Sequence, residues 1–186
     1  MSGDPATEGF ARPGPVCLAG AVHPAVRAAR ESDVPRIHEL VLALAEYERA
    51  RDEVAATTDQ LRDALFGPAP AVHALVAEHD GRVVGFAVWF LNFSTWQGVH
   101  GIYLEDLFVE PAHRGSGLGK ALLQALAEIA VERGYARFEW SVLDWNQPAI
   151  DFYRAMGAAP QDGWTVWRVA GDRLPALAGG TALASS

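Results

Sequence analysis

A glycine-rich segment late in the chain has the residue types of a phosphate-binding loop. It reads Arg-Gly-Ser-Gly-Leu-Gly-Lys over residues 114–120 and leads into a long apolar-periodic stretch. Glycines allow tight turns and let a ligand approach the main chain without meeting a Cβ atom. A helix start adds unpaired N–H groups and the positive end of the helix dipole. Together these features favour the binding of a pyrophosphate.

Three phosphate-binding loops can be compared with this segment. A Walker loop requires glycine at position 114 and Ser or Thr after the lysine, whereas this chain has Arg114 and Ala121. A dinucleotide loop requires Gly-x-Gly-x-x-Gly near the first strand, whereas this loop lies late and is spaced Gly-x-Gly-x-Gly. The pattern Arg-x-x-Gly-x-Gly fits at Arg114, Gly117 and Gly119. Taken alone, the loop could also be a turn that only joins a strand to a helix.

A second motif, Asn-x-x-Ala-x-x-Phe-Tyr, lies downstream at residues 146–153. With the glycine loop before it, this motif resembles the GNAT superfamily of acetyltransferases, and the resemblance extends over residues 26–169. Within the superfamily the chain resembles the diamine (spermidine/spermine) acetyltransferases and their thialysine-acetylating relatives. The segments that carry this closer resemblance are Arg27-Ala28-Ala29 with Asp33, Leu44-Ala45-Glu46-Tyr47-Glu48, Tyr103 to Val109, and Trp145 to Tyr153.

The resemblance implies that acetyl-CoA is the co-substrate. The sequence has no Cys/His zinc pattern, so we expect no metal. Main-chain groups of the strand before the loop would bind the acetyl-pantetheine arm, the loop would bind the pyrophosphate, and the helix start after Asn146 would contact the coenzyme. The coenzyme-binding residues implied are Leu107, Phe108, Val109, Arg114, Gly115, Ser116, Gly117, Leu118, Gly119, Lys120, Asn146 and Ala149.

The resemblance also implies an amine pocket and a general acid. The pocket would contain Tyr47, Glu48, Glu105 and Asp162, and Tyr153 would be the general acid. Tyr47 and Glu48 fit equally well as the polar end of the first helix. Asp162 also fits an ordinary turn, because Gln-Asp-Gly is a common turn sequence. Tyr153 alone could be a core tyrosine, and Glu105 could form a surface ion pair.

These residue types suit direct transfer of an acetyl group to a primary amine. A lysine-like amine has a pKa of about 10.4, so it must lose a proton before it can attack a thioester. Glu105 could accept that proton through an ordered water, and Tyr153 could protonate the departing thiolate. Backbone N–H groups near Phe108 and Val109 could polarise the thioester carbonyl. No covalent enzyme intermediate is required.

The loop before Tyr103 differs in sequence from the corresponding loop of the polyamine enzymes. Those enzymes carry an acidic residue two positions before a tryptophan, where this chain has Ser94 before Trp96. Residues 93–96 resemble the thialysine-type relatives more closely. A protein or peptide N-acetyltransferase is the alternative enzyme, and a non-catalytic acyl-CoA-binding regulator is the alternative outside enzymes. Glu48 and Glu105 favour a compact cationic substrate over a peptide.

Composition limits which other functional classes of protein fit this sequence. The 186 residues carry a net charge of −8, the opposite of the basic surface that nucleic-acid binding favours. Cys17 is the single cysteine, so no internal disulfide can form, and the histidines show no ligand spacing. No apolar run approaches the length of a membrane span. We expect a cytoplasmic protein with a small-molecule amine substrate, and the resemblance implies a homodimer.

The elements that must position these residues follow a mixed α/β order. We expect a flexible extension over residues 1–24, one acetyltransferase domain over 25–175 and a flexible tail over 176–186. Hydrophobic periodicity predicts a central mixed sheet flanked by about four helices. The strands are expected at 26–29, 71–78, 82–91, 101–109, 137–142 and 164–169. The helices are expected from about residue 34 to 45, at 58–66, at 119–133 and at 148–156.

Overall fold

The computed structural model describes residues 23–179, which divide into two compact units at residues 143 and 144. The predicted extension 1–24 and tail 176–186 lie mostly outside the described residues. The first unit contains a five-stranded sheet in the order β1-β2-β3-β4-β5. Its strands are β1 (Val26–Ala28), β2 (His73–His79), β3 (Arg82–Ser94), β4 (Val99–Val109) and β5 (Phe138–Trp140). Neighbouring strands are antiparallel except β4 and β5, which are parallel.

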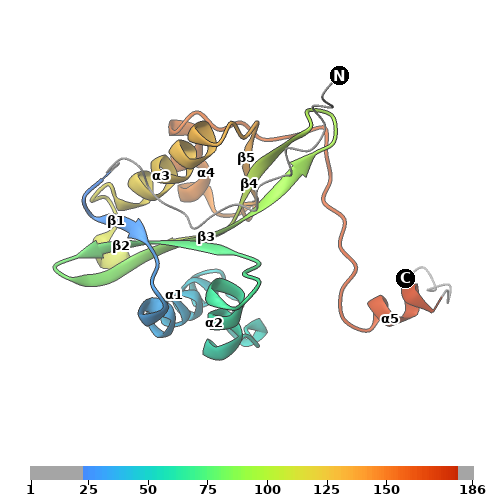
Figure 1. Ribbon diagram of the computed structural model, residues 1–186, viewed down its shortest axis with the longest axis horizontal. Coiled ribbons are helices and arrows are strands. Elements are labelled where there is room, and N and C mark those ends of the chain that lie inside the picture. The colour runs from blue at the N-terminus through green and yellow to red at the C-terminus, as the bar shows by residue number, and fades with distance from the viewer. Residues whose placement is uncertain (1–22, 180–186) are drawn as a thin grey trace, which may run out of the picture. The chain divides into compact units, whose positions relative to one another are not determined.

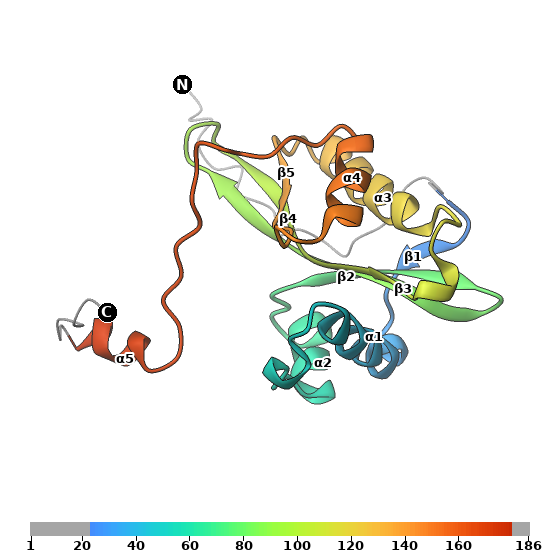
Figure 2. The same cartoon turned by 180° about the vertical axis from the view of Figure 1, so that it is seen from behind.

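Three longer helices and three short 3-10 turns complete the first unit. The helices are α1 (Val34–Tyr47), α2 (Thr58–Phe66) and α3 (Leu118–Glu132), and the turns are η1 (Glu31–Asp33), η2 (Arg51–Glu53) and η3 (Pro111–His113). Helices α1 and α2 lie on one face of the sheet and α3 lies on the other (Figure 1). The reverse view shows the same two layers around the sheet (Figure 2). The predicted fold class, a mixed sheet flanked by helices, is confirmed.

The two faces of the sheet have separate apolar contacts. On the α1 and α2 side, Ile37 and Leu40 pack with Phe86, Val88 and Phe108 in one buried cluster. Side chains alternate between the faces of a strand, so the fully buried Trp89 points to the α3 side. Leu122, Leu126 and Ile129 form the buried stripe of α3 at helical spacing. Strand β4 therefore lies between two packed layers.

Strands β2 and β3 form a hairpin with a two-residue turn. The two strands are joined by the two residues Asp80 and Gly81, which have φ values of 50° and 75°. Positive φ at both positions defines a type I′ turn, whose twist matches that of the paired strands. The Asp-Gly dipeptide is a preferred sequence for this turn. The strand register shifts once, between Ala77 and Glu78.

The second unit contains α4 (Gln147–Ala155) and α5 (Arg173–Ala178). Helix α4 was predicted, whereas the short α5 was not. The predicted strand at residues 164–169 is wrong for the described structure, because these residues form neither helix nor strand and are exposed. Trp164 and Trp167 are 76% and 90% exposed in the single chain. Aromatic and β-branched residues favour a strand, but a strand forms only when a neighbouring edge pairs with it.

Within residues 23–179, no helix has the length and apolar content that a bilayer crossing requires. The same residues contain no group of three or more His, Cys, Asp or Glu side chains arranged to hold a metal ion.

Candidate active site

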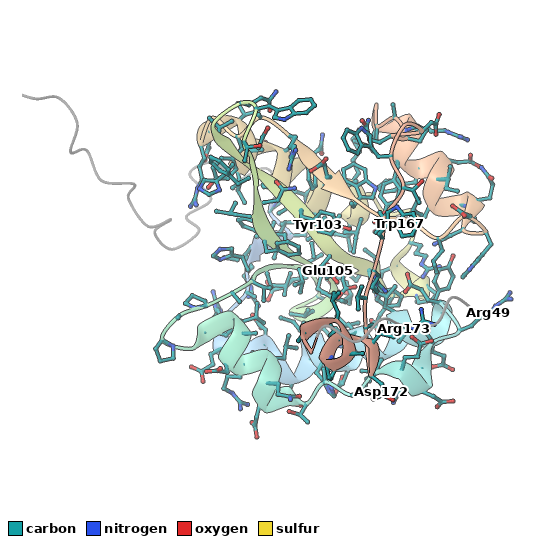
Figure 3. All side chains as sticks on the ribbon, turned by 90° about the vertical axis from the view of Figure 1, so that its right-hand side faces the viewer. Arg49, Tyr103, Glu105, Trp167, Asp172 and Arg173 are labelled. Carbon is teal, nitrogen blue, oxygen red and sulfur yellow. The ribbon has the colours of Figure 1, made fainter. Side chains whose placement is uncertain are left out.

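Strand β4 contains a bulge at Glu105. Trp89 of β3 pairs with Leu104 and Val88 pairs with Asp106, so Glu105 is an extra residue without an opposite partner on β3. A bulge of this kind bends the strand and changes the direction of the side chains that follow it. Tyr103 and Glu105 are labelled along this strand in Figure 3. The bulge therefore lies at the residue that the sequence predicts to be catalytic.

The bulge brings an acidic side chain to the face that α1 covers. Residues opposite each other on paired strands share a face, and Phe90 and Val88 are opposite Tyr103 and Asp106. Val88 belongs to the cluster beneath α1, so Tyr103 and Asp106 both lie on that side, although they are three residues apart. Regular alternation would have placed them on opposite faces. Sequence analysis missed Asp106 for this reason, and its only signal was a Glu-Asp pair inside an apolar strand.

Three carboxylates interact at this position. Burial raises the pKa of Asp106 to about 6, with smaller contributions from the neighbouring carboxylates of Glu105 and Glu48. Burial also raises the pKa of Glu48. We refer to Glu48, Glu105 and Asp106 as the acidic cluster. A group of three carboxylates favours the binding of a cation, because a positive charge offsets the repulsion between them.

The end of α1 fixes the position of Glu48. The main-chain N–H of Ala50 donates to the carbonyl of Ala45 (2.8 Å), and that of Arg49 donates to Glu46 (3.1 Å). Arg49 has φ of 63°, so the chain turns sharply just after Glu48. Arg49 is labelled in Figure 3. This left-handed ending is a common helix stop, and it leaves Glu48 as the last residue before the turn.

Strands β4 and β5 separate beyond a short paired region. Their pairing covers Ile102–Leu104 and Phe138–Trp140. The Tyr103 hydroxyl lies 2.9 Å from Oγ of Ser141, which is one residue past the end of β5. From residue 105 to 109, β4 continues without a pairing partner in β5, so main-chain groups along that edge are available to a ligand. Phe108 and Val109 are buried, so their main-chain groups rather than their side chains would make such contacts.

The glycine loop has the conformation that its sequence predicts. Gly115 and Gly117 have φ values of 78° and 89°, in the region that disfavours other residues. A Cβ atom at either position would meet open space, so the backbone angle accounts for glycine there. Gly117 is the N-cap of α3 and supplies no capping side chain to its first N–H groups. Ser116 Oγ donates to the His113 carbonyl (2.6 Å), which steadies the turn.

Arg114 connects the loop to the rest of the first unit. Its Nε donates to the Val109 carbonyl at the end of β4 (3.1 Å). Its guanidinium lies 4.7 Å from the centre of the Tyr47 ring and 5.5 Å from that of Phe108. Cation–π contacts of this kind stabilise both groups. The Arg114 side chain therefore positions the loop against β4 and α1, and Tyr47 contacts this arginine.

Helix α4 carries the second motif in the second unit. Asn146 is buried and is the N-cap of α4, where its Oδ1 accepts from the Ala149 N–H (3.4 Å). Pro148 occupies the first turn, a position that proline favours. Tyr153 is half-buried, with its ring centre 5.4 Å from that of Phe152. Asn146, Ala149 and Tyr153 share one helical face by their spacing of three and four residues. Asp162 lies in an exposed turn.

The placements can be compared with the sequence predictions one unit at a time. In the first unit, Glu48 and Glu105 come together with Asp106, while Tyr47 contacts Arg114. The residues predicted to bind the coenzyme lie along the unpaired part of β4 and around the start of α3. In the second unit, Asn146, Ala149 and Tyr153 lie along α4. The free strand edge and the glycine-lined helix start fit a ligand that has both amide and phosphate groups.

The chain is similar to several known proteins. Residues 34–158 match the Acetyltransferase (GNAT) family. A thialysine N-epsilon-acetyltransferase of Bos taurus is 38% identical over 165 residues, which cover 83% of this chain and 96% of that protein. An L-ornithine N5-acetyltransferase of Arabidopsis thaliana is 32% identical over an alignment 197 residues long, which covers 82% of this chain and 86% of that protein.

A solved structure has a similar fold. An integron cassette protein from the mobile metagenome of V. cholerae has a TM-score of 0.70 and 26% identity, covering 82% of this chain and 96% of that one. The resemblance inferred from the glycine loop and the Asn146 motif is confirmed, and so is the prediction of an enzyme. The chain belongs to the GNAT acetyltransferase family and is an acetyltransferase.

Proposed function

We propose that the enzyme transfers an acetyl group from acetyl-CoA directly to a primary amine of a small cationic molecule, such as a thialysine-like amino acid, a diamine or a polyamine. The observation that carries this proposal is the acidic cluster beside the point where β4 and β5 separate. An amine substrate is cationic at neutral pH, and three carboxylates stabilise such a charge. The relatives from Bos taurus and Arabidopsis thaliana are named for thialysine and ornithine, which are amino acids with a side-chain amine.

The donor would bind along β4 and at the loop. Its amide-bearing arm would pair with main-chain groups at residues 107–109, in the manner of an added strand. Its pyrophosphate would lie against the N–H groups that follow Gly117 at the start of α3. Arg114 positions this loop through its hydrogen bond to the Val109 carbonyl. Asn146 and Ala149 would supply further contacts from α4.

The protein's groups would move two protons during the transfer. Glu105 would accept a proton from the substrate ammonium through a water, which leaves a neutral amine able to attack the acetyl carbonyl. The new C–N bond forms as the C–S bond breaks. Tyr153 would protonate the departing sulfur and would then regain a proton from the nitrogen, which loses its second proton to become an amide. Main-chain N–H groups near Phe108 and Val109 would stabilise the negative charge that develops on the carbonyl oxygen. Asp106 and Glu48 would hold the substrate's positive charge.

A substrate panel tests this proposal. Purified protein is given acetyl-CoA with thialysine, lysine, ornithine, a diamine, spermidine and a lysine-containing peptide, and thiol release is followed. We expect turnover with one or more of the small cationic amines and much less with the peptide. Turnover of the peptide alone would establish a peptide N-acetyltransferase. Tight acetyl-CoA binding without any turnover would establish a non-catalytic acyl-CoA-binding protein.

We also propose that the enzyme is a cytoplasmic homodimer that needs no nucleic acid, membrane or metal for its reaction. The net charge of −8 and the single cysteine support a cytoplasmic protein that does not bind nucleic acid. The exposed tryptophans of the second unit support a subunit contact. Light scattering of the purified chain tests the oligomeric state. Activity assays with a chelator test whether the reaction needs a metal.

A further inference from the structure

The segment between β4 and the glycine loop is held by contacts at both of its ends. We refer to residues 110–114 as the linking segment, which contains the turn η3. In Figure 2 this segment, in yellow, lies beside the tip of the β2–β3 hairpin, where the His79 and His113 rings are 4.8 Å apart. The loop that follows contains Gly115 and Gly117, and glycine allows more backbone freedom than other residues. The position of the loop therefore depends on what holds the linking segment before it.

Glu110 fixes the start of the linking segment. Its Oε1 accepts hydrogen bonds from Arg36 of α1 (2.6 Å) and from Arg82 of β3 (3.1 Å). The Glu110 and Arg36 side chains are 22% and 23% exposed, so salt and water screen their pair less than a fully exposed one. Arg36 is itself held in place, because its Nε donates to the Val83 carbonyl (3.0 Å). One carboxylate thus joins the linking segment to a helix and to a neighbouring strand.

Arg114 fixes the end of the linking segment. Its Nε donates to the Val109 carbonyl, and its guanidinium lies 4.7 Å from the centre of the Tyr47 ring. Tyr47 is the last residue of α1 and packs against the buried cluster beneath that helix. The face of an aromatic ring and the C-terminal end of a helix both attract a positive charge. Tyr47 therefore anchors Arg114, and with it the linking segment, to α1.

We propose that Glu110 and Tyr47 are positioning residues for acetyl-CoA: they hold the two ends of the linking segment and so keep the glycine loop in place before the coenzyme binds. Neither residue has to touch the coenzyme. A loop that is already held in position loses less conformational entropy on binding, so its ligand binds more tightly. This inference rests on the proposed binding of acetyl-CoA at the loop. It gives Tyr47 a role at the donor site, whereas the family resemblance implies a role in the amine pocket.

The charge of Glu110 provides a sharp test, because charge and position predict opposite effects. Glu110→Gln removes a negative charge, and by charge alone this should strengthen the binding of a polyanionic coenzyme. The substitution also weakens the hydrogen bonds with Arg36 and Arg82, because a neutral acceptor binds a guanidinium less strongly than a carboxylate does. We expect the loss of position to dominate. The Kd for acetyl-CoA, measured by calorimetric titration, should rise about fivefold.

Glu39→Gln is the matched control for this change. Glu39 pairs with the same arginine, 2.7 Å from Arg36 Nη1, but it lies within α1 and its side chain is 63% exposed. Its substitution removes the same charge without altering a residue of the linking segment, so the Kd for acetyl-CoA should stay constant or decrease. An unchanged or lower Kd in Glu110→Gln would overturn the role of Glu110. An equal rise in both variants would also overturn it, because the effect would then come from Arg36.

Two variants of Tyr47 separate the aromatic ring from its hydroxyl. Tyr47→Phe keeps a ring face for Arg114 and should leave the Kd for acetyl-CoA close to that of the wild type. Tyr47→Leu keeps an apolar side chain without a ring face, and should raise this Kd about threefold, as expected for loss of an exposed cation–π contact. The same Kd in both variants would overturn the role of Tyr47 at the donor site.

A shorter ligand distinguishes a misplaced loop from a disturbed fold. Acetylpantetheine has the acetyl-bearing arm of acetyl-CoA but lacks the pyrophosphate and the nucleotide. Its Kd, measured by NMR titration, should be the same in the wild type, Glu110→Gln and Tyr47→Leu, and far-ultraviolet spectra of the same samples check the fold. Weaker binding of acetylpantetheine in the variants would show that β4 itself is disturbed and would overturn the inference. A wild type that does not bind acetyl-CoA would overturn the proposed donor site and this inference together. A wild type that binds acetyl-CoA no more tightly than the two variants do would overturn this inference alone.

Discussion

Asp106 is a carboxyl group that changes its charge close to neutral pH. Its folded pKa is about 6, raised chiefly by burial, whereas an aspartate in an unfolded chain has a pKa of about 3.9. The folded protein therefore holds this proton more tightly, and the free energy of unfolding falls as pH rises between these two values. Asp106→Asn should raise the free energy of unfolding at pH 8 by on the order of 1–3 kcal/mol, with little change at pH 4. Urea denaturation at both pH values measures the difference.

The same substitution should weaken the amine site. The KM for the amine should increase in Asp106→Asn at pH 8, because one of the three charges that attract the substrate is lost. Asp52→Asn, an exposed carboxylate in η2, is the matched control and should change neither quantity. Equal gains in stability at pH 4 and pH 8 would contradict the raised pKa. An unchanged KM for the amine would separate Asp106 from the substrate site.

Tyr153 is proposed to give a proton to the departing sulfur. Tyr153→Phe should lower kcat by about 100-fold, within the usual range for loss of a general acid, and should leave acetyl-CoA affinity nearly unchanged. Single-turnover kinetics and calorimetric titration of the coenzyme measure the two effects separately. Tyr135→Phe, which removes a hydroxyl from the segment after α3, should leave both quantities unchanged. Equal losses of kcat and coenzyme affinity would instead indicate a structural role for Tyr153.

Helix α3 begins and ends with a glycine at positive φ, which allows a controlled comparison. Gly117 has φ of 89° at the loop, and Gly134 has φ of 65° after the last turn. Alanine at either position should lower the free energy of unfolding by about 1–2 kcal/mol, because both backbones are left-handed and a Cβ meets no neighbour. Gly117→Ala alone should also raise the Kd for acetyl-CoA, by about tenfold if the N–H groups of the loop lose 1.4 kcal/mol of binding.

Thermal denaturation and coenzyme titration of the two glycine variants check this prediction. Loss of coenzyme affinity in both variants would mean that helix stability, rather than the loop conformation, controls binding. Unchanged affinity in Gly117→Ala would exclude the start of α3 as the pyrophosphate site. The comparison is informative because the two positions share the same helix and the same kind of backbone strain, and differ only in which end of α3 they occupy.

Elements with local signals were predictable from the sequence, and elements that depend on distant partners were not. The Asp80-Gly81 turn carries its own conformational preference, and the α3 stripe carries its own period. The bulge at Glu105 depends on how β4 pairs with β3, which no local pattern encodes. Asp106 was missed with it. The segment at 164–169 has a strand pattern, but a strand also requires an edge to pair with, and pattern alone cannot supply one.

At the scale of the whole molecule, family and reaction class could be recognised because two motifs in a fixed order place a phosphate site and a tyrosine on one chain. Some predicted site residues are expected to act through their side chains, and others through their main-chain groups. Arg114 illustrates the difficulty, since its motif position suggests the coenzyme while its side chain contacts Val109 and Tyr47. Its orientation depends on the distance between α1 and β4, which only the folded unit defines.

The net charge predicts how salt affects the two substrates. A protein with a charge of −8 attracts a cationic amine and repels a polyanionic coenzyme. Exposed charges are screened beyond about 10 Å at 0.1 M salt. The kcat/KM for the amine should therefore fall as salt is raised, and more steeply for a dication than for a monocation. The KM for acetyl-CoA should stay constant or decrease over the same range, because screening weakens the repulsion. Steady-state assays with each substrate varied at low and high sodium chloride measure both trends. Equal decreases of kcat/KM for the amine and for acetyl-CoA would show that salt acts on protein stability. If kcat/KM for a dication did not change with salt, the acidic surface would not contribute to substrate capture.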